Sequence, residues 1–347
     1  MEDYWFAGKL LKWFHENGRP LPWRETRDPY LIWLSEIILQ QTRIEQGQPY
    51  WERFVGRWPR VEMLAAATED EVLRLWQGLG YYSRARNLHT AARQIVERGR
   101  FPNTFSEIRQ LKGVGDYTAA AIASIAFDEP VAVVDGNVYR LLSRHFAIET
   151  PINTTEGKKQ FTQLANQLLP PHEASAFNQA MMDFGAIQCT PQSPRCLLCP
   201  LADSCLALAE GSIAKLPVKL KKLTVKERRM TYVYIRHNGC VAIRRRPAGD
   251  IWQGLWEPYL LPEGQKPEEA FPNADLRLLR KDVKHVLTHR ILLADFYLWE
   301  PTERLTLPDG YQWTPEADLN SYALPRLIEQ LVKGLAGEIY HGGSKNS

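Results

Sequence analysis

The chain has 347 residues, of which 44% are hydrophobic, and a formal net charge of +3. This length is enough for a large core and two domains, whereas so small a charge does not by itself indicate a nucleic-acid partner. The N-terminus carries acids and no apolar segment, so no secretory signal is expected, and the longest apolar runs are too short or too interrupted to span a bilayer. We therefore expect an intracellular, cytoplasmic protein with no membrane contact.

Hydrophobic residues recur with helical spacing along most of the chain before residue 210. The first such segment, 5–16, brings aromatic and aliphatic side chains to one face. No strand pattern is found in this part, so residues 1–210 are predicted to form an all-α domain. Further helices are predicted at 30–43, 44–57, 69–76, 81–98, 116–126, 137–147, 155–168 and 173–185.

The composition changes after Cys205. Residues 211–228 are rich in Lys and Arg, so we expect an exposed basic linker that is either a solvated tether or lies along a phosphate backbone. Alternating or apolar runs predict strands at 232–236, 240–244 and 291–299, and a closing helix is predicted at 325–335. Residues 229–340 are therefore predicted to be a second, α+β domain, with a disordered tail at 341–347.

The segment 111–140 carries two features that suit a phosphate-bearing ligand. Glycines at both ends of Gly113-Val114-Gly115 allow a turn that exposes its amides at the head of a helix starting near Asp116, where phosphate can bind. Asp135 follows an apolar strip and precedes the next predicted helix, whose dipole favours the ionised carboxyl. Each feature by itself has a simpler explanation, because glycines commonly end helices and an aspartate commonly caps the start of one.

Two carboxyls have contrasting surroundings in the sequence. Glu36 lies in an apolar helix, so burial in a groove would raise its pKa and keep it protonated, whereas Asp135 at a helix start is expected to stay an anion. Carboxyls whose pKa values are pushed apart in this way are typical of paired general-acid and charge-stabilising roles. The alternative for Glu36 is a solvated face, because Gln40 and Arg43 share its stripe of the helix.

Four of the five cysteines, Cys189, Cys196, Cys199 and Cys205, have the spacing C-x6-C-x2-C-x5-C. Four clustered thiols predict a metal site in a reducing compartment rather than a disulfide framework. A structural zinc usually has two C-x2-C knuckles, of which only one is present, whereas the whole pattern resembles the [4Fe-4S] loop of the endonuclease III and adenine glycosylase superfamily. Cys240 stands apart on a predicted strand, where a buried free thiol is expected.

Further motifs are WLSEIILQQT at 33–42, GLGYYSRAR at 78–86, LKGVG at 111–115, VDGNV at 134–138 and FNQAMMDFG at 177–185. Together with the cysteines they are similar to motifs of the MutY family of adenine DNA glycosylases, in the same order and with compatible spacing. The resemblance covers residues 1–210 and implies an all-α helix-hairpin-helix glycosylase domain with a [4Fe-4S] loop at 189–205. Residues 229–340 resemble the degenerate Nudix-like domain attached to these enzymes.

The resemblance implies a monomeric, nucleoid-associated enzyme that removes adenine mispaired with 8-oxoguanine or guanine in double-stranded DNA. Glu36 would protonate the adenine ring and later assist water. Asp135, supported by Asn137, would stabilise the sugar cation as an anion or through a transient covalent bond. The remaining site residues carried over are Trp23, Arg24 and Gln179 in the adenine pocket, with packing and helix polarity as alternatives, and Gln41 and Tyr81 as wedges filling the space of the flipped nucleotide.

Position 117 distinguishes two related reactions. Endonuclease III-like lyases carry a Schiff-base lysine two residues after the second glycine of the hairpin, and this chain has Tyr117. Lys112 precedes the turn and is explained by phosphate contact. We therefore expect a glycosylase without an efficient strand-cleaving step. The alternative enzyme is a bifunctional endonuclease III-like pyrimidine glycosylase and lyase, and a non-catalytic protein that binds damaged DNA is disfavoured by the two carboxyls.

The C-terminal domain lacks the Nudix metal box after Gly264, so magnesium-dependent nucleotide hydrolysis is not expected. In the family this domain reads 8-oxoguanine through a loop usually written Phe-Ser-His. The corresponding residues are Leu287-Thr288-His289, in which Thr288 keeps a hydroxyl and Leu287 replaces the aromatic face. Thr288 and His289 are therefore candidate lesion-binding residues, with an ordinary strand edge as the equal alternative for His289.

Overall fold

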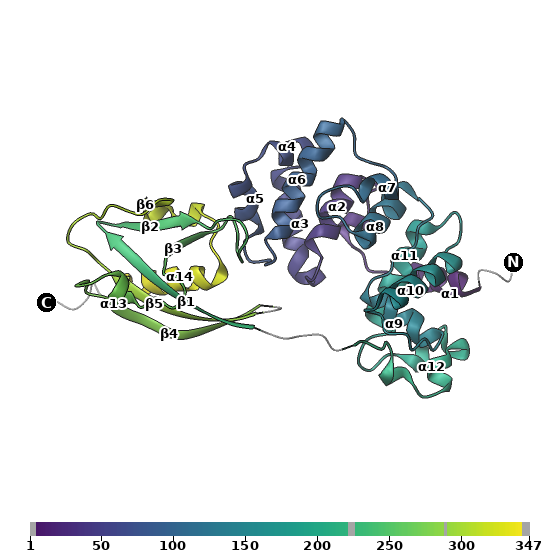
Figure 1. The fold of residues 1–347 in the computed structure, drawn as a ribbon. Helices are drawn as coiled ribbons and strands as arrows, with labels where there is room; N and C mark the ends of the chain where they lie inside the picture. The colour runs from purple at the N-terminus through teal and green to yellow at the C-terminus, as the bar shows by residue number, and fades with distance from the viewer. Residues whose placement is uncertain (1–4, 221–225, 288–289, 342–347) are drawn as a thin grey trace. The chain divides into compact units, whose positions relative to one another are not determined.

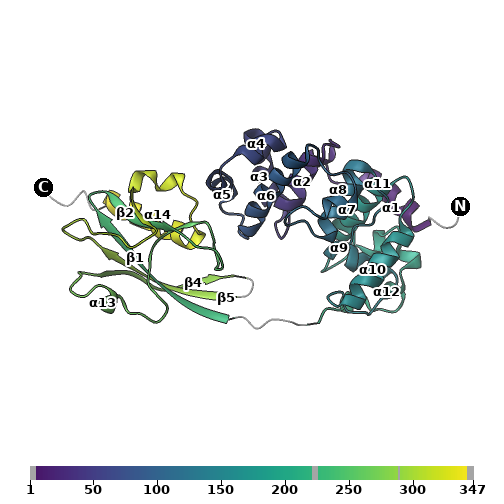
Figure 2. The same ribbon diagram turned by 45° about the horizontal axis from the view of Figure 1, so that its top comes forward.

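The computed structural model describes residues 5–220, 226–287 and 290–341, with side chains up to residue 335. The described residues form two compact units, one within 5–66 and 87–220 and the other within 67–86 and 226–341. The first unit is helical, and the second is built on a sheet (Figures 1 and 2). The predicted order, an all-α domain followed by an α+β domain, is confirmed. Thr288, His289 and tail residues 342–347 lie outside the described residues.

The helices lie close to where hydrophobic spacing predicts them. None of those in the described chain is long and apolar enough to cross a membrane. The longer ones are α1 (Trp5–Asn17), α2 (Pro29–Ile38), α3 (Ile44–Arg57), α4 (Val61–Ala66), α5 (Glu69–Trp76), α6 (Ser83–Arg98), α8 (Asp116–Phe127), α9 (Gly136–His145), α10 (Thr155–Leu168), α11 (Ala174–Asp183) and α14 (Arg326–His341). Short ones are α7 (Phe105–Ile108), α12 (Leu206–Ala209) and α13 (Pro267–Ala270), with single turns at η1 (Pro22–Arg24), η2 (Phe184–Gln188), η3 (Cys196–Leu198), η4 (Ala202–Ser204), η5 (Ile213–Lys215) and η6 (Glu316–Ser321).

Helix α2 is shorter than the predicted 30–43 helix. It ends at Ile38, and the chain turns through residues 39–42, where Gln41 has the left-handed φ of +57°. A right-handed helix cannot continue through such a residue. The polar end of the segment therefore lies on a separate turn, and helix α11 likewise passes into the π-helical turn η2.

Buried side chains of α1, α9, α10 and α11 form a hydrophobic core cluster of the helical unit. Its members include Leu10, Leu142, Phe161 and Phe177, which are fully buried or nearly so. Helix α2 packs against α3 and α8, while α8 also contacts α11. This packing brings the segment with Glu36 next to the segment with Tyr117 and so positions the site described below.

The second unit contains a six-stranded sheet with the order β4-β5-β1-β3-β2-β6. Strands β1 and β5 are parallel, and the other neighbours are antiparallel. One face of the sheet packs against α14, and the opposite face packs against the segment around α13 (Figure 1). The strands are β1 (Lys226–His237), β2 (Cys240–Arg245), β3 (Trp256–Leu260), β4 (Arg277–Val286), β5 (Arg290–Trp299) and β6 (Tyr311–Pro315).

Three strands were not predicted, and β1 begins inside the stretch expected to be a linker. Edge strand β4 is mostly exposed and charged, so it lacks the apolar alternation that reveals a half-buried strand. Strands β3 and β6 are only five residues long. At the start of β1, Lys226 pairs in parallel register with Arg290, and Arg228 forms an ion pair with Asp250 at 2.6 Å. The last three residues of that stretch, 226–228, therefore belong to the sheet.

A buried ionic network fixes β2 and β3 to each other. Glu257 has a fully buried side chain and accepts hydrogen bonds from Arg244 Nε at 3.0 Å and from Tyr232 Oη at 3.1 Å. Arg246, which is 2% exposed, also pairs with Glu257. Buried charges of this kind are tolerated only when each has its partner, so every member depends on the others.

Replacing Glu257 by Gln should lower the free energy of unfolding by about 3–5 kcal/mol, because two guanidinium groups lose their buried counter-charge. A urea titration of the full chain measures this loss. The control is Glu300→Gln, whose carboxylate pairs with Arg236 at 2.9 Å but is 57% exposed. That variant should lose at most about 1 kcal/mol. Equal losses in the two variants would contradict the importance of the buried network.

Candidate active site

Glu36 and Asp135 lie on the wall of one cavity of about 410 Å³ in the helical unit. Glu36 comes from α2, and Asp135 is the residue that caps α9. Tyr117 from the first turn of α8 lines the same cavity, as does Asn137. Residues from three separate segments of the sequence therefore meet at one concave site, as a paired acid and charge-stabiliser require.

Asp135 is held by three N–H groups. Its Oδ1 accepts from the backbone amides of Asn137 and Val138, both at 2.8 Å, and its Oδ2 accepts from Asn137 Nδ2 at 2.7 Å. Donors at a helix N-terminus stabilise the carboxylate, yet burial outweighs them, so the pKa of Asp135 is raised above its ordinary value. The sequence indicated the donors but not the extent of desolvation.

Asn137 is itself fixed from the other side. Its Oδ1 accepts from Arg140 Nη2 at 2.9 Å, and Arg140 Nε donates to the carbonyl oxygen of Cys189 at 2.7 Å. Gly185 in η2 passes so close that a Cβ there would lie 2.6 Å from the carbonyl oxygen of Asn137. A glycine is therefore required at this crossing, and it lets η2 pack against the start of α9.

Glu36 has the perturbed pKa expected of a general acid. The pKa of its carboxyl is raised to about 7: burial is the largest cause and the nearby Asp135 adds to it, while the Tyr117 hydroxyl and the Arg24 charge act in the opposite direction. Burial also raises the pKa of Tyr117 well above its usual value. The hydroxyl therefore stays protonated and able to donate.

Trp23 and Arg24, on the single turn η1, also line this cavity. Trp23 is buried and packs edge-on against Trp51, with ring centroids 5.6 Å apart. Arg24 forms an ion pair with Asp183 at 2.7 Å. The sequence analysis missed Asp183 and also Arg19, which lines the cavity. A lone acid within the apolar motif 177–185 was the available signal for Asp183.

Gln179 lies on the wall of a neighbouring cavity of about 480 Å³, which shares Arg24 with the first. Its Nε2 donates to the carbonyl oxygen of Ser175 at 3.3 Å. Gln41 is exposed and does not line the cavity with Glu36. The structure thus places Trp23 and Arg24 at the carboxyl pair, with Gln179 next to it and Gln41 outside.

Tyr81 belongs to the second unit, where it lines a cavity of about 650 Å³ together with Trp252, His285 and Leu287. Its side chain is 50% exposed, and its φ of +47° is unusual for a residue with a side chain. Leu287 is the described member of the predicted lesion-reading loop. The loop's other two residues lie outside the described chain.

The predicted hairpin lies between α7 and α8. Gly113 has a φ of +80°, and a Cβ there would meet the Asn87 side chain at 2.6 Å, so glycine is needed. The Val114 amide donates to Leu111 within the turn at 3.1 Å. In the described chain, the amides of Gly113 and Gly115 have no acceptor. These two amides are therefore the ones that the turn can offer to an anion.

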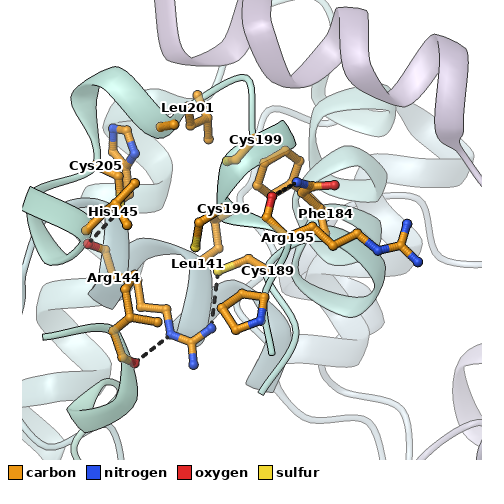
Figure 3. A pocket seen from close by; sticks show the side chains of 15 residues that line it. Leu141, Arg144, His145, Phe184, Cys189, Arg195, Cys196, Cys199, Leu201 and Cys205 are labelled. Carbon is orange, nitrogen blue, oxygen red and sulfur yellow. Dashed lines mark hydrogen bonds between the residues drawn. The ribbon is translucent and has the colours of Figure 1, made fainter. Parts of the chain in front are cut away.

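The four clustered cysteines line a common cavity (Figure 3). Arg144 connects their loop to α9, since its Nη1 donates to Cys189 Sγ at 3.5 Å and to the Thr190 carbonyl oxygen at 2.7 Å. Burial raises the pKa of the Cys199 thiol to about 11, and a bound metal cation would favour the thiolate form there.

The residues of this cavity fit a cluster with thiolate ligands. Its lining includes the four sulfur donors, two arginines and His145, whose buried Nδ1 has no hydrogen-bond partner in the described chain. As the side chains lie in the described part of the chain, no group of three or more His, Cys, Asp or Glu residues is arranged to hold a metal ion, so the fit rests on the chemistry of the four sulfur donors. Cys240 is a half-buried free cysteine on β2, apart from the other four.

Models of three known families match the chain. The model of HhH-GPD superfamily base excision DNA repair proteins covers residues 34–171, and that of the iron-sulfur binding domain of endonuclease III covers 189–205. A NUDIX domain model covers residues 231–334. The predicted iron-sulfur loop and Nudix-like domain are thereby confirmed.

Solved structures share the helical fold. A thermostable thymine-DNA glycosylase has a TM-score of 0.55 and 31% identity, covering 59% of this chain and 95% of its own. A trapped endonuclease III–DNA covalent intermediate has a TM-score of 0.52 and 22% identity, over 59% of this chain and 94% of its own. At that identity the second likeness concerns the fold alone.

Relatives in sequence extend over both units. An adenine DNA glycosylase of Buchnera aphidicola subsp. Schizaphis graminum is 35% identical over 281 residues, which are 80% of this chain and 77% of the relative. The adenine DNA glycosylase of Homo sapiens is 43% identical over 232 residues, 61% of this chain and 42% of the relative. With the carboxyl pair, the hairpin and the cysteine loop in place, the chain belongs to the adenine DNA glycosylase family, enzymes of base excision repair.

Proposed function

We propose that this enzyme excises adenine lying opposite 8-oxoguanine, or guanine, in double-stranded DNA, acting as a monomer. The observation that carries the proposal is the shared cavity of Glu36 and Asp135, whose wall also includes Tyr117. A base inside a duplex cannot reach such a cavity, so the nucleotide has to be flipped out of the stack. Family membership favours adenine as that base.

Glu36 supplies the proton in the proposed reaction. As the bond between the sugar carbon and the base nitrogen breaks, its electron pair moves to the base, and the Glu36 proton neutralises the ring nitrogen that receives the charge. A pKa near 7 suits this role, because the carboxyl is still substantially protonated at neutral pH. The resulting carboxylate then accepts a proton from the water that attacks the sugar.

Asp135 stabilises the positive charge that develops on the sugar. Its three N–H donors hold both oxygens in place and favour the carboxylate over the acid. Asn137 contributes two of these donors and is a positioning residue. Stabilisation is electrostatic or proceeds through a bond between a carboxylate oxygen and the sugar carbon, which water later breaks.

DNA is held outside the cavity by the remaining candidate residues. The exposed hairpin amides of Gly113 and Gly115 suit a backbone phosphate. Gln41 and Tyr81 both have left-handed backbones and exposed side chains, a strained arrangement that occurs at functional positions. We assign them the role of wedges that replace the flipped nucleotide in the stack.

Trp23, Arg24 and Gln179 are proposed to bind the adenine, and Thr288 and His289 the lesion opposite it. The Nudix-like region 229–340 would read that lesion, with 211–228 as the linker after the catalytic domain 1–210. Tyr117 in place of a lysine supports hydrolysis without a Schiff base, and therefore without efficient strand cleavage. A pyrimidine glycosylase with lyase activity remains the second candidate because the endonuclease III fold is shared.

The cluster is proposed to be [4Fe-4S], bound by Cys189, Cys196, Cys199 and Cys205. The local C-x6-C-x2-C-x5-C spacing and the common cavity support this type. When bound, it joins four thiolates and so stabilises the loop that contacts Arg140 and Arg144. None of the proton transfers above needs it.

A duplex with adenine opposite 8-oxoguanine tests the function. The protein should release free adenine and leave the strand uncut, and borohydride should trap no covalent complex. Glu36→Gln should slow release by about 10²–10⁴-fold, because Gln cannot donate the proton. Glu52→Gln, an exposed residue of α3, is the matched control. Release of a pyrimidine with strand cleavage would favour the second candidate instead.

The single-turnover rate should have a bell-shaped pH dependence. It should fall as pH rises through about 7, where Glu36 loses its proton. It should also fall in acid, starting above the range of an ordinary aspartate because the pKa of Asp135 is raised. Excision measured with enzyme in excess over the lesion duplex tests both limbs. A rate that stays constant between pH 6 and 9, taken as roughly one unit below and two above the Glu36 value, would contradict the acid role.

Cys199→Ser should lose most of its iron and sulfide and its visible absorbance, because one thiolate ligand is removed. Cys240→Ser should keep them, because Cys240 is not in the cysteine cavity. Iron and sulfide analysis of the two purified variants makes the comparison. A 1:1 ratio of iron to sulfide, with about four of each per chain, would support the [4Fe-4S] type, whereas one zinc per chain would refute it.

A further inference from the structure

Asp183 is a buried acid beside the catalytic cavity to which the proposed reaction gives no role. It is the last residue of α11, and its side chain is 0% exposed. The carboxylate accepts from the Arg19 backbone amide at 3.0 Å and from Arg19 Nε at 2.9 Å. It also binds Arg24 in bidentate fashion, with Nη1–Oδ2 at 2.7 Å and Nη2–Oδ1 at 2.8 Å. The three side chains form a triad of two cations and one anion.

Arg24 is the member of the triad that lies between the two cavities. It lines the cavity of Glu36 and Asp135 and also the neighbouring cavity of Gln179. Its Nη1 donates in addition to the Arg19 carbonyl oxygen at 2.9 Å, and its guanidinium carbon lies 5.4 Å from the Phe14 ring centroid. In the described chain its Nε–H has no acceptor. Because Asp183 accepts hydrogen bonds from both Nη atoms of Arg24, it determines which Arg24 donors remain for a bound base.

We propose that Asp183 is a positioning and charge-setting residue for adenine excision. It holds Arg24 on the wall between the two cavities, and it cancels one of the two positive charges that Arg19 and Arg24 place beside Glu36. The inference rests on the proposed role of Glu36 as the proton donor. It adds that the negative charge of Asp183 helps to keep Glu36 protonated, because it offsets one of the nearby arginines.

The charge balance around Glu36 follows from the groups that face it. Tyr117 comes from α8, Asp135 from the start of α9 and Arg24 from η1. Arg19, Arg43 and Glu45 complete the charged lining of the cavity. A positive charge favours the ionised form of a carboxyl. With Asp183 the triad carries a net charge of +1, and without it the charge would be +2, so Glu36 would lose its proton at lower pH.

The test is the alkaline limb of the single-turnover excision rate on the adenine:8-oxoguanine duplex. In Asp183→Asn the limb should move to lower pH by about half a unit or more, because the net charge rises to +2. In Arg19→Gln it should move to higher pH, because the net charge falls to zero. The double variant Asp183→Asn/Arg19→Gln restores +1 and should return the limb toward its wild-type position.

A limb that stays in place in Asp183→Asn while the rate falls equally at every pH would overturn the proposal, since Asp183 would then be only structural. Thermal melting and iron content establish whether each variant is folded. If Asp183→Asn does not fold, Arg19→Gln is the decisive variant, because it keeps the Asp183–Arg24 pair. A shift of its alkaline limb to higher pH supports the proposal, and an unshifted limb overturns it. Full activity of Glu36→Gln would instead refute the proton-donor role itself, so the two failures are distinguishable.

Discussion

The structure depends on removing two carboxyls from water at one site. Burial raises the pKa values of both Glu36 and Asp135, and the nearby Asp135 charge raises that of Glu36 further. Their surroundings differ: Asp135 accepts three N–H donors at the start of α9, whereas Glu36 shares its cavity wall with the Tyr117 hydroxyl. This difference favours an anion at one position and a proton at the other.

Two packing contacts and one turn position the side chains and amides of this site. Helix α2 packs on α8, which brings Glu36 to Tyr117, and η2 crosses the start of α9 at Gly185, where no larger residue fits. The hairpin before α8 turns at Gly113 and leaves two amides free in the described chain. In this unit one helix start holds the Asp135 carboxyl with N–H donors, and another, at α8, follows a turn with two exposed amides of the kind that suit an anion.

The cysteine loop is joined to the same scaffold by arginines of α9. Arg140 contacts the Cys189 carbonyl oxygen and the Asn137 side chain, and Arg144 contacts Cys189 Sγ and the next residue of the loop. The loop, α9 and the Asp135 cap are therefore parts of one hydrogen-bonded assembly. Its rigidity suits a reaction that depends on fixed charges rather than on moving parts.

The sequence alone determined the helical and α+β halves, the cysteine loop, and the pairing of Glu36 with Asp135, because periodicity, ligand spacing and cap residues are local signals. It did not reveal strands β3, β4 and β6, whose short or exposed segments are defined by their neighbours in the sheet. Only the tertiary structure decided that α2 ends at Ile38, that Gln179 lies next to the carboxyl cavity rather than in it, and that Asp183 binds Arg19 and Arg24. Burial and charge pairing involve residues more than 150 positions apart along the chain, such as Arg24 and Asp183, so no local pattern records them.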